Sequence, residues 1–182
     1  SAIICGLARS TPGDIDRCAE AVRKAARPRI HTFISTSPVH MKHKLKMTPD
    51  QVKAEAASGV ARARGYTGDV EFSPEDASRS DFDFMCEVLQ IAVDNGATTL
   101  NIPDTVGYGI PEEYPARLQL RGEQSQSRGA VKRPVSLIQQ LFRRVVDVQQ
   151  HRVELPPGPR GRLPPRRRRA ARGWRHAHRA AR

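Results

Sequence analysis

Long apolar stretches are missing from this 182-residue sequence. A transmembrane helix needs roughly 18 or more consecutive apolar residues, and no stretch here approaches that length. From Ser1 the sequence leads directly into a short strand-like segment, without the charged and then apolar regions of a signal peptide. We therefore expect no membrane partner, and we expect further sequence upstream of Ser1.

Cysteine is also scarce, because only Cys5, Cys18 and Cys86 occur and they are far apart. The sequence has no Cys-x-x-Cys pair and no Cys/His spacing typical of a zinc site. An odd number of widely separated cysteines favours free thiols over disulfides. We expect a reducing compartment and buried cysteine side chains.

Acidic residues are nearly absent from the last third of the sequence. Residues 119–182 hold 17 Lys and Arg but 3 Asp and Glu, whereas residues 1–118 hold 14 and 16. The formal net charge of +12 therefore comes from the second segment, which is also rich in Pro and Gly. Such a segment buries too little apolar area to offset the entropy lost on folding. We expect a folded domain over 1–118 and a mostly disordered or non-native basic tail over 119–182.

Residues 1–118 contain short apolar segments at the spacing of successive βα units. Strands are expected at 2–8, 29–35, 69–73 and 98–102, the first of them buried on both faces. A helix is predicted after each of the first three strands, with inner faces formed by apolar residues at helical spacing. These are Ile15, Cys18, Ala19, Val22 and Ala26 in the first helix, Val52, Ala56, Val60 and Ala63 in the second, and Phe84, Val88, Ile91 and Ala92 in the third.

The ends of these helices carry sequence signals of their own. Thr11 before Pro12 is typical of an N-cap, and Thr48-Pro49-Asp50-Gln51 is typical of a capping box with proline at the first helical position. Gly65 is predicted to end the second helix as a left-handed cap. Ser80 is predicted to cap the third helix, which should stop at Asn95-Gly96.

Polar groups cluster where the third and fourth predicted strands end. The run from Asp69 to Ser80 passes from a strand into a polar loop, and the run from Thr98 to Tyr108 repeats this plan. An α/β barrel keeps its chemistry at the carboxyl ends of its strands, so the pattern indicates an active site. Simpler interpretations remain for single residues: Glu75 could cap a helix or pair with Arg79, and Asp76 and Asp104 could only orient loops.

Four segments of the sequence together resemble the 2-isopropylmalate synthase family. They are Ile4 to Arg9, Ile30 to Ser37, Val70 to Arg79 and Asn101 to Tyr108, in the family's order and covering about residues 1–118. The resemblance implies an α/β fold, with residues 1–118 forming a pyruvate carboxyltransferase-like catalytic domain. This domain would be a partial (β/α)8 TIM barrel in which these strands are about the third to the sixth. It also implies an acyltransferase of leucine biosynthesis that condenses acetyl-CoA with the 2-oxo acid 3-methyl-2-oxobutanoate, acting as a homodimer in the bacterial cytoplasm or the plastid stroma.

The resemblance also implies roles for four residues. His31 resembles a histidine near the acyl donor, Ser73 and Glu75 resemble a pair that contacts the oxo acid, and Thr105 resembles a threonine that binds its carboxylate. Taken alone, His31 could be a hydrogen-bonded core histidine and Thr105 a turn-stabilising residue. The basic loop 42–46 could be a solvated face or could attract the phosphates of coenzyme A.

The sequence departs from the family in the residues for a divalent metal (Mg, Mn or Zn). The family's Arg-Asp-Gly-Glu motif, which supplies a metal ligand and the catalytic arginine, does not occur in these 182 residues. His176-Ala177-His178 has the spacing of the family's second metal motif but lies in Arg-rich sequence. We therefore expect no metal ligands, no catalytic residue and no activity in this fragment alone.

Two alternatives stay open at this stage. A citramalate or homocitrate synthase fragment would share the same motifs. In a different class, residues 119–182 could make the protein a basic nucleic-acid-binding adaptor. We expect no specific nucleic-acid partner, because Arg166 to Arg169 would bind phosphates without sequence preference and Trp174 is the only tryptophan available for base stacking.

Overall fold

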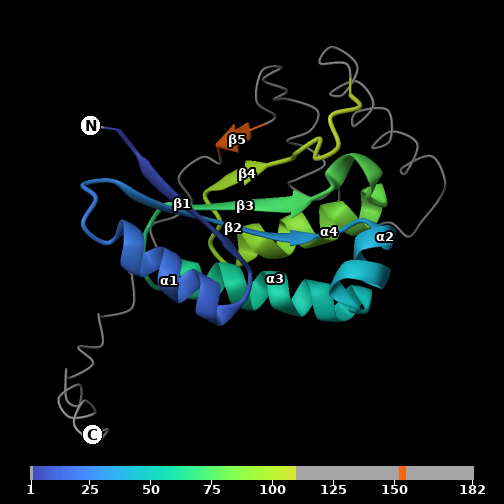
Figure 1. The fold of residues 1–182 in the computed structure, drawn as a ribbon, viewed down its shortest axis with the longest axis horizontal. Coiled ribbons are helices and arrows are strands. Elements are labelled where there is room, and N and C mark those ends of the chain that lie inside the picture. Colours follow the sequence, from blue (N-terminus) through green and yellow to red (C-terminus); the bar gives the residue numbers. More distant parts are fainter. Residues whose placement is uncertain (1, 110–151, 155–182) are drawn as a thin grey trace, which may run out of the picture.

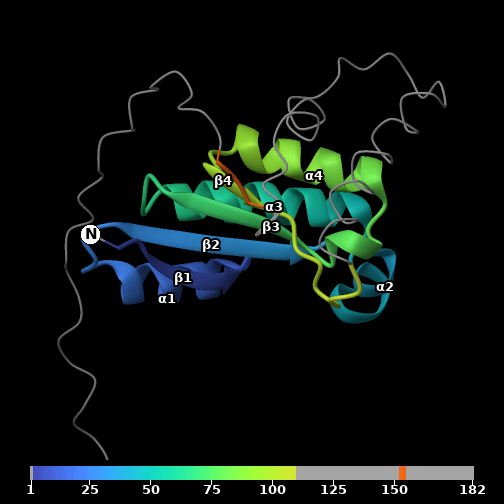
Figure 2. The same cartoon turned by 90° about the horizontal axis from the view of Figure 1, so that it is seen from above.

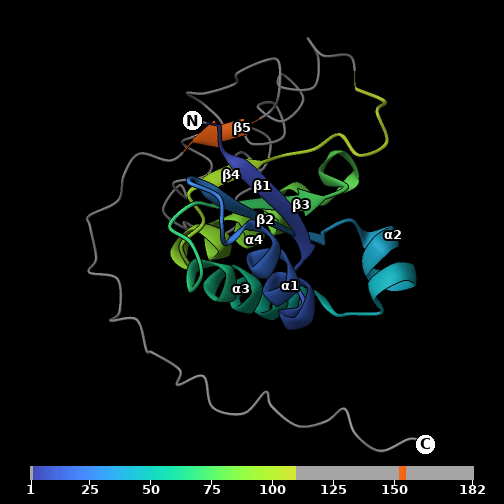
Figure 3. The same ribbon diagram turned by 60° about the vertical axis from the view of Figure 1, so that its left-hand side comes forward.

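The fold is a parallel sheet with helices on one face. The computed structural model describes residues 2–109 and 152–154. Strands β1 (Ile4–Arg9), β2 (Pro28–Ser35), β3 (Val70–Glu75) and β4 (Thr99–Asn101) pair in parallel in the order of the sequence. Helices α1 (Pro12–Val22), α3 (Pro49–Arg64) and α4 (Phe82–Asp94) connect them and lie together on one side of the sheet (Figures 1 and 3).

This arrangement distinguishes between the two common parallel α/β architectures. In a doubly wound sheet the strand order reverses and helices cover both faces. Here the strand order follows the sequence order, and all three connecting helices return on the same side. These are the features of consecutive units of a (β/α) barrel, which confirms the fold class expected from the sequence.

The core lies between the sheet and the three helices. Even-numbered residues of the strands face the helices, as the register pairs Gly6 with Ile30, Ile30 with Val70, and Phe72 with Leu100. Burying a large aliphatic or aromatic side chain stabilises a fold by about 1.5–3 kcal/mol, so this layer supplies most of the cohesion. Its fully buried large apolar members are Phe72, Ile15, Ile30, Met85, Leu89, Leu100, Val52, Val60, Val70 and Val88.

Shorter elements gather at the carboxyl ends of the strands. Helix α2 (Pro38–His40) and the π-helical turn η1 (Met41–Leu45) follow β2, and the 3-10 turn η2 (Ala77–Arg79) follows β3. Figure 2 shows α2 at the same end of the sheet as the loops that leave β3 and β4. The turn η1 overlaps the predicted basic loop 42–46, and α2 directly precedes η1.

A fifth strand comes from the basic segment. β5 (Arg152–Glu154) pairs antiparallel with β4, with Leu100 opposite Val153. The sequence did not predict this strand. The predicted tail otherwise lies outside the described residues.

The predicted helix ends are partly confirmed. Both hydrogen bonds of the Thr48–Gln51 capping box form, and α4 ends at Asp94, with Asn95 as its C-cap and then Gly96 with φ +105°. Two cap predictions are wrong. Gly65 is right-handed, with φ −65°, because its N–H continues the bonding to Ala61. Asp81, rather than Ser80, caps α4, because its carboxylate accepts from the N–H of Phe84.

The predictions for β1 and α1 also need correction. β1 is not buried on both faces, because Leu7 on its odd-numbered face is 64% exposed, and Ile4, the first residue of the strand, is 51% exposed. Among the described residues its only partner strand is β2, and no helix covers its odd-numbered side chains. Helix α1 ends at Val22, before the predicted inner residue Ala26, which is exposed.

The cysteines divide between the two faces of the sheet. All three are free thiols, as predicted. Cys18 and Cys86 are buried, and burial raises the pKa of each thiol. Cys5 is exposed, contrary to the prediction, because it is an odd-numbered residue of β1.

An ion pair ties α1 to α3 at the surface. The guanidinium of Arg62 donates to both carboxylate oxygens of Asp16 at 2.6 Å, and the hydroxyl of Tyr66 donates to the same carboxylate at 2.7 Å. These bonds lower the pKa of Asp16 to about 2.

No helix in the described part of the chain is both long and apolar enough to cross a membrane.

Helix α3 packs closely against the turn after β1 at Gly59. A Cβ added there would lie 2.8 Å from the Cβ of Ser10 and 3.0 Å from its carbonyl oxygen, whereas a Cβ added at Gly13 in α1 would meet nothing within 4 Å. Crowding of a packed contact typically costs about 1–3 kcal/mol. We predict that Gly59→Ala unfolds at lower urea concentration than Gly13→Ala by a stability difference of this size. Equal stabilities of the two variants of the 182-residue chain would contradict the packing.

Candidate functional site

The odd-numbered residues of the strands form a polar face opposite the helices. His31 is opposite Glu71 in the register, Phe33 is opposite Ser73, and Ser35 is opposite Glu75. Side chains of successive strand residues point to opposite faces, so these residues share the face that the helices leave uncovered. Polar groups on this face are therefore positioned by the same alternation that builds the core.

His31 and Ser73 are in direct contact. The Nε2 atom of His31 and the hydroxyl of Ser73 form a hydrogen bond of 2.6 Å. The Nδ1 atom of His31 lies 3.6 Å from Oε1 of Glu71. A hydrogen bond at one ring nitrogen and a carboxylate near the other restrict the orientation of the ring, which suits the histidine to present a nitrogen or relay a proton.

Arg29 and Glu71 form a buried charged pair beside this histidine. Nη1 of Arg29 donates to Oε2 of Glu71 at 3.2 Å, and its Nε donates to Asp69 at 2.7 Å. Burial alone would lower the pKa of Arg29, but the two carboxylates raise it above its ordinary value. The guanidinium thus stays charged with only 5% of the residue exposed.

Glu75 lies at the last position of β3, not in a loop as predicted. Nζ of Lys44 donates to both of its carboxylate oxygens, at 2.8 and 2.7 Å, and the hydroxyl of Ser35 donates to Oε2. Burial favours the neutral acid, but the bonds from Lys44 and Ser35 outweigh it and lower the pKa of Glu75. Glu75 therefore does not pair with Arg79.

The π-helical turn η1 presents Lys44 to this carboxylate. Such turns are rare and are frequent at functional sites. Lys46, at its end, takes a left-handed conformation with φ 55°, which closes the turn. The loop 42–46 is thus not only a solvated basic face, because one of its lysines is part of the polar cluster.

Asp76 organises the loop after β3. Its φ of 65° is unusual for a residue other than glycine, and its carboxylate accepts from Nε of Arg79 at 2.7 Å. Burial would raise the pKa of Asp76, but Arg79, Ser37 and His40 lower it. The loop-orienting role predicted for Asp76 agrees with these contacts, and Arg79 binds Asp76 instead of Glu75.

Thr105 joins the loop after β4 to the loop after β3. Its Oγ1 accepts from the backbone N–H of Asp76 at 2.9 Å. Since Oγ1 is the acceptor there, the O–H of Thr105 can still donate to a ligand. Of the four predicted residues, His31 lies near the middle of β2, Ser73 and Glu75 lie in the carboxyl-terminal half of β3, and Thr105 lies in the loop after β4; His31 and Ser73 are hydrogen-bonded to one another.

Several members of the cluster were missed by the sequence analysis, namely Cys5, Arg29, Lys44 and Glu71. A signal for two of them was present: Arg29 and Glu71 share the odd-numbered positions of His31 and Ser73 in otherwise apolar strands. A charged residue on that side of a buried strand must be paired, which indicates a polar face. Lys44 had no such signal, because its position depends on the π-helical turn.

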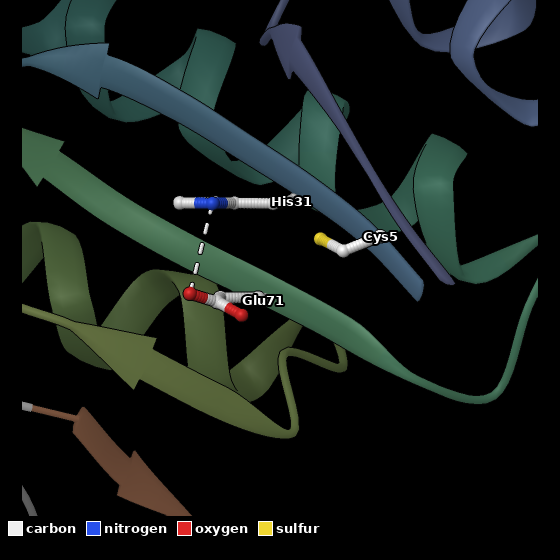
Figure 4. A group of neighbouring side chains, drawn as sticks. All are labelled: Cys5, His31 and Glu71. Carbon is white, nitrogen blue, oxygen red and sulfur yellow. Dashed lines mark ion pairs between the residues drawn. The ribbon is translucent and has the colours of Figure 1, made fainter. Parts of the chain in front are cut away.

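The described residues contain neither of the two metal-binding motifs that the family resemblance implies. One group of metal-ligating side chains meets among them, Cys5, His31 and Glu71, with ligand atoms within 4.8 Å of one another (Figure 4). Thiol and imidazole suit thiophilic metals, whereas Mg²⁺ requires oxygen ligands. His176-Ala177-His178 lies outside the described residues.

The contact between Lys44 and Glu75 predicts a pH effect. The lowered pKa means that the pair stabilises the fold above the ordinary value of 4.5 and that this stabilisation is lost as pH falls through the folded pKa. We predict that Lys44→Met raises the pKa of Glu75, because burial then acts with less opposition, and costs about 1 kcal/mol or less at neutral pH. An NMR titration of the Glu75 carboxyl carbon in the 182-residue chain measures this shift. Lys42→Met, in the same turn, is the control, and an unchanged pKa in Lys44→Met would contradict the pairing.

Comparison with known proteins places this chain in a family. The chain is 63% identical over 111 residues to the 2-isopropylmalate synthase of Methylococcus capsulatus, covering 61% of this chain and 22% of that protein. It is 60% identical over 114 residues to the 2-isopropylmalate synthase of Bradyrhizobium sp. (strain ORS 278), covering 63% and 22%. The chain thus spans about a fifth of the length of the curated relatives it matches. The family model described as HMGL-like matches residues 1–126, and the chain belongs to this family.

Proposed function

We propose that this chain carries the substrate-binding segment of an acyl-CoA-condensing transferase of the 2-isopropylmalate synthase type. The observation that carries the proposal is the polar face formed by β2, β3 and the turn after β2, where His31 contacts Ser73 and Lys44 contacts Glu75. The high identity to two 2-isopropylmalate synthases over this segment supports the same reaction. Leucine biosynthesis is the pathway that follows from it.

The proposed reaction joins acetyl-CoA and 3-methyl-2-oxobutanoate. The thioester methyl group loses a proton, its carbon forms a bond to the ketone carbon, and the ketone oxygen takes up a proton. Water then cleaves the thioester, which releases coenzyme A and leaves a second carboxylate. A divalent metal supplies Lewis-acid polarisation of the ketone in the complete family enzyme.

The residues of this chain would bind and orient the two substrates. If Nε2–H of His31 donates to Ser73, then the Ser73 hydroxyl is left to donate to a substrate oxygen. The hydroxyl of Thr105 can donate to the carboxylate of the oxo acid, because its oxygen already accepts from Asp76. Glu75, ionised beside Lys44, would contact the oxo acid together with Ser73.

The proposal also concerns the catalytic arginine and the metal ligand, which this chain would lack when alone. Its sequence has no Arg-Asp-Gly-Glu motif, so the arginine and the metal ligand of that motif would have to come from elsewhere. We infer that the 182-residue chain does not catalyse the condensation by itself. Activity would need the rest of the barrel and the homodimer typical of the family. The proposed location, bacterial cytoplasm or plastid stroma, follows from the pathway.

A chimera tests the function of this segment. Residues 2–109 would replace the matching segment of the Methylococcus capsulatus enzyme, and coenzyme A release would be measured with acetyl-CoA and 3-methyl-2-oxobutanoate. We predict an active chimera in which Glu75→Gln lowers kcat/KM by about 100-fold, because the substrate is then misplaced. Glu20→Gln, on the exposed side of α1, is the matched control.

Two results would overturn the proposal. One is an inactive chimera that is folded by circular dichroism while the parent enzyme is active in the same assay. The other is equal kcat/KM in the Glu75→Gln and Glu20→Gln chimeras. Replacing the oxo acid by pyruvate or 2-oxoglutarate distinguishes the citramalate and homocitrate alternatives, and faster turnover of either would reassign the substrate.

A further inference from the structure

Three neighbouring strands each contribute one metal-ligating side chain to the same point. Cys5 comes from β1, His31 from β2 and Glu71 from β3 (Figure 4). Leu7 pairs with His31 and His31 pairs with Glu71, so all three ligands are odd-numbered residues on the polar face. We propose that Cys5, His31 and Glu71 bind a thiophilic divalent cation such as Zn²⁺.

The spacing of the three ligand atoms fits a single small cation. With zinc–ligand distances of about 2.0–2.3 Å, two ligands of a tetrahedral site lie about 3.3–3.8 Å apart. Nδ1 of His31 and Oε1 of Glu71 are 3.6 Å apart, and all the ligand atoms lie within 4.8 Å of one another. The 3.6 Å separation exceeds the roughly 3.2 Å of an N–H···O hydrogen bond, but it matches two ligands of one ion. The thiol needs to move by only about 1 Å.

The hydrogen bond to Ser73 prepares His31 for this role. Metal-bound histidines usually donate their other ring N–H to an oxygen acceptor, which fixes the tautomer and the ring orientation. Here Nε2 contacts Oγ of Ser73 at 2.6 Å, so that donation from Nε2–H leaves the lone pair of Nδ1 directed toward Glu71. The same contact would hold the ring in place before the cation arrives.

Arg29 holds the carboxylate of Glu71 in a similar way. It donates to Oε2, and Oε1 is the oxygen that faces His31. The positive charge of Arg29 would repel the cation, but this charge is also paired with the carboxylate of Asp69. When Cys5 releases its proton to solvent and its sulfur binds the metal, two carboxylates and one thiolate balance one guanidinium and one divalent ion.

The exposure of Cys5 gives the cation a route to the site. Glu71 is buried, with 4% of its side chain exposed, and His31 is 17% exposed. Cys5, in contrast, is exposed. A fourth ligand position can be filled by water, as in zinc sites with three protein ligands.

Cobalt titration of the 182-residue chain tests the proposal without any catalytic assay. Co²⁺ bound to a thiolate gives a charge-transfer absorption in the near ultraviolet, which Zn²⁺ removes by displacement. We predict this band in the unmodified chain, its loss in Cys5→Ser, and an affinity for Co²⁺ at least about tenfold lower in Glu71→Gln. Circular dichroism of each variant checks that it is folded.

Two control variants separate this site from other ligands in the chain. Cys86→Ser removes a buried thiol, and the double variant His176→Ala and His178→Ala removes a histidine pair in the basic segment. Both should keep the band. The proposal is overturned if the unmodified chain gives no band, if the band survives in Cys5→Ser, or if either control loses it.

A measurement on the unmodified chain covers the case in which a variant fails to fold. Alkylation of Cys5 by iodoacetamide, followed by peptide mass spectrometry, should be slowed about tenfold or more by Zn²⁺. Equal rates with and without Zn²⁺ would contradict the site. Because both tests use the metal alone, they are independent of whether the chain serves the proposed condensation reaction.

Discussion

The two-residue period of the β-strand is the constraint on which this structure depends. On β2 and β3, even-numbered residues such as Ile30 and Phe72 are fully buried against the helices. Odd-numbered residues such as His31 and Ser73 form the polar cluster on the other face. A shift of one residue in the register would therefore exchange the core and the polar face together. The strand register therefore determines both the stability of the fold and the position of the site.

Local sequence signals predicted much of the fold. The inner face of α3, Val52 to Ala63, follows from its spacing, and the Thr48–Gln51 capping box follows from its own residues. Predictions failed where a residue had a competing partner. The hydroxyl of Ser80 bonds to Thr36 and to the carbonyl of Asp76, and Asp81 caps the helix in its place.

The polar cluster was predictable only in part. His31, Ser73, Glu75 and Thr105 were found through motifs, whereas their partners Arg29, Glu71 and Lys44 were not. Arg29 meets Asp69 and Glu71 across about forty residues of sequence, and Lys44 meets Glu75 across thirty-one. Such pairs depend on strand register and on an uncommon π-helical turn, and neither is encoded in a local pattern.

The antiparallel strand β5 has a consequence for the outer edge of β4. A strand has two hydrogen-bonding edges, and β3 occupies one edge of β4 while β5 occupies the other. In a closed parallel barrel, that second edge would receive the next parallel strand. The same N–H and C=O groups cannot serve both neighbours. Docking of Arg152–Glu154 and extension of the barrel at β4 are therefore mutually exclusive states of this edge.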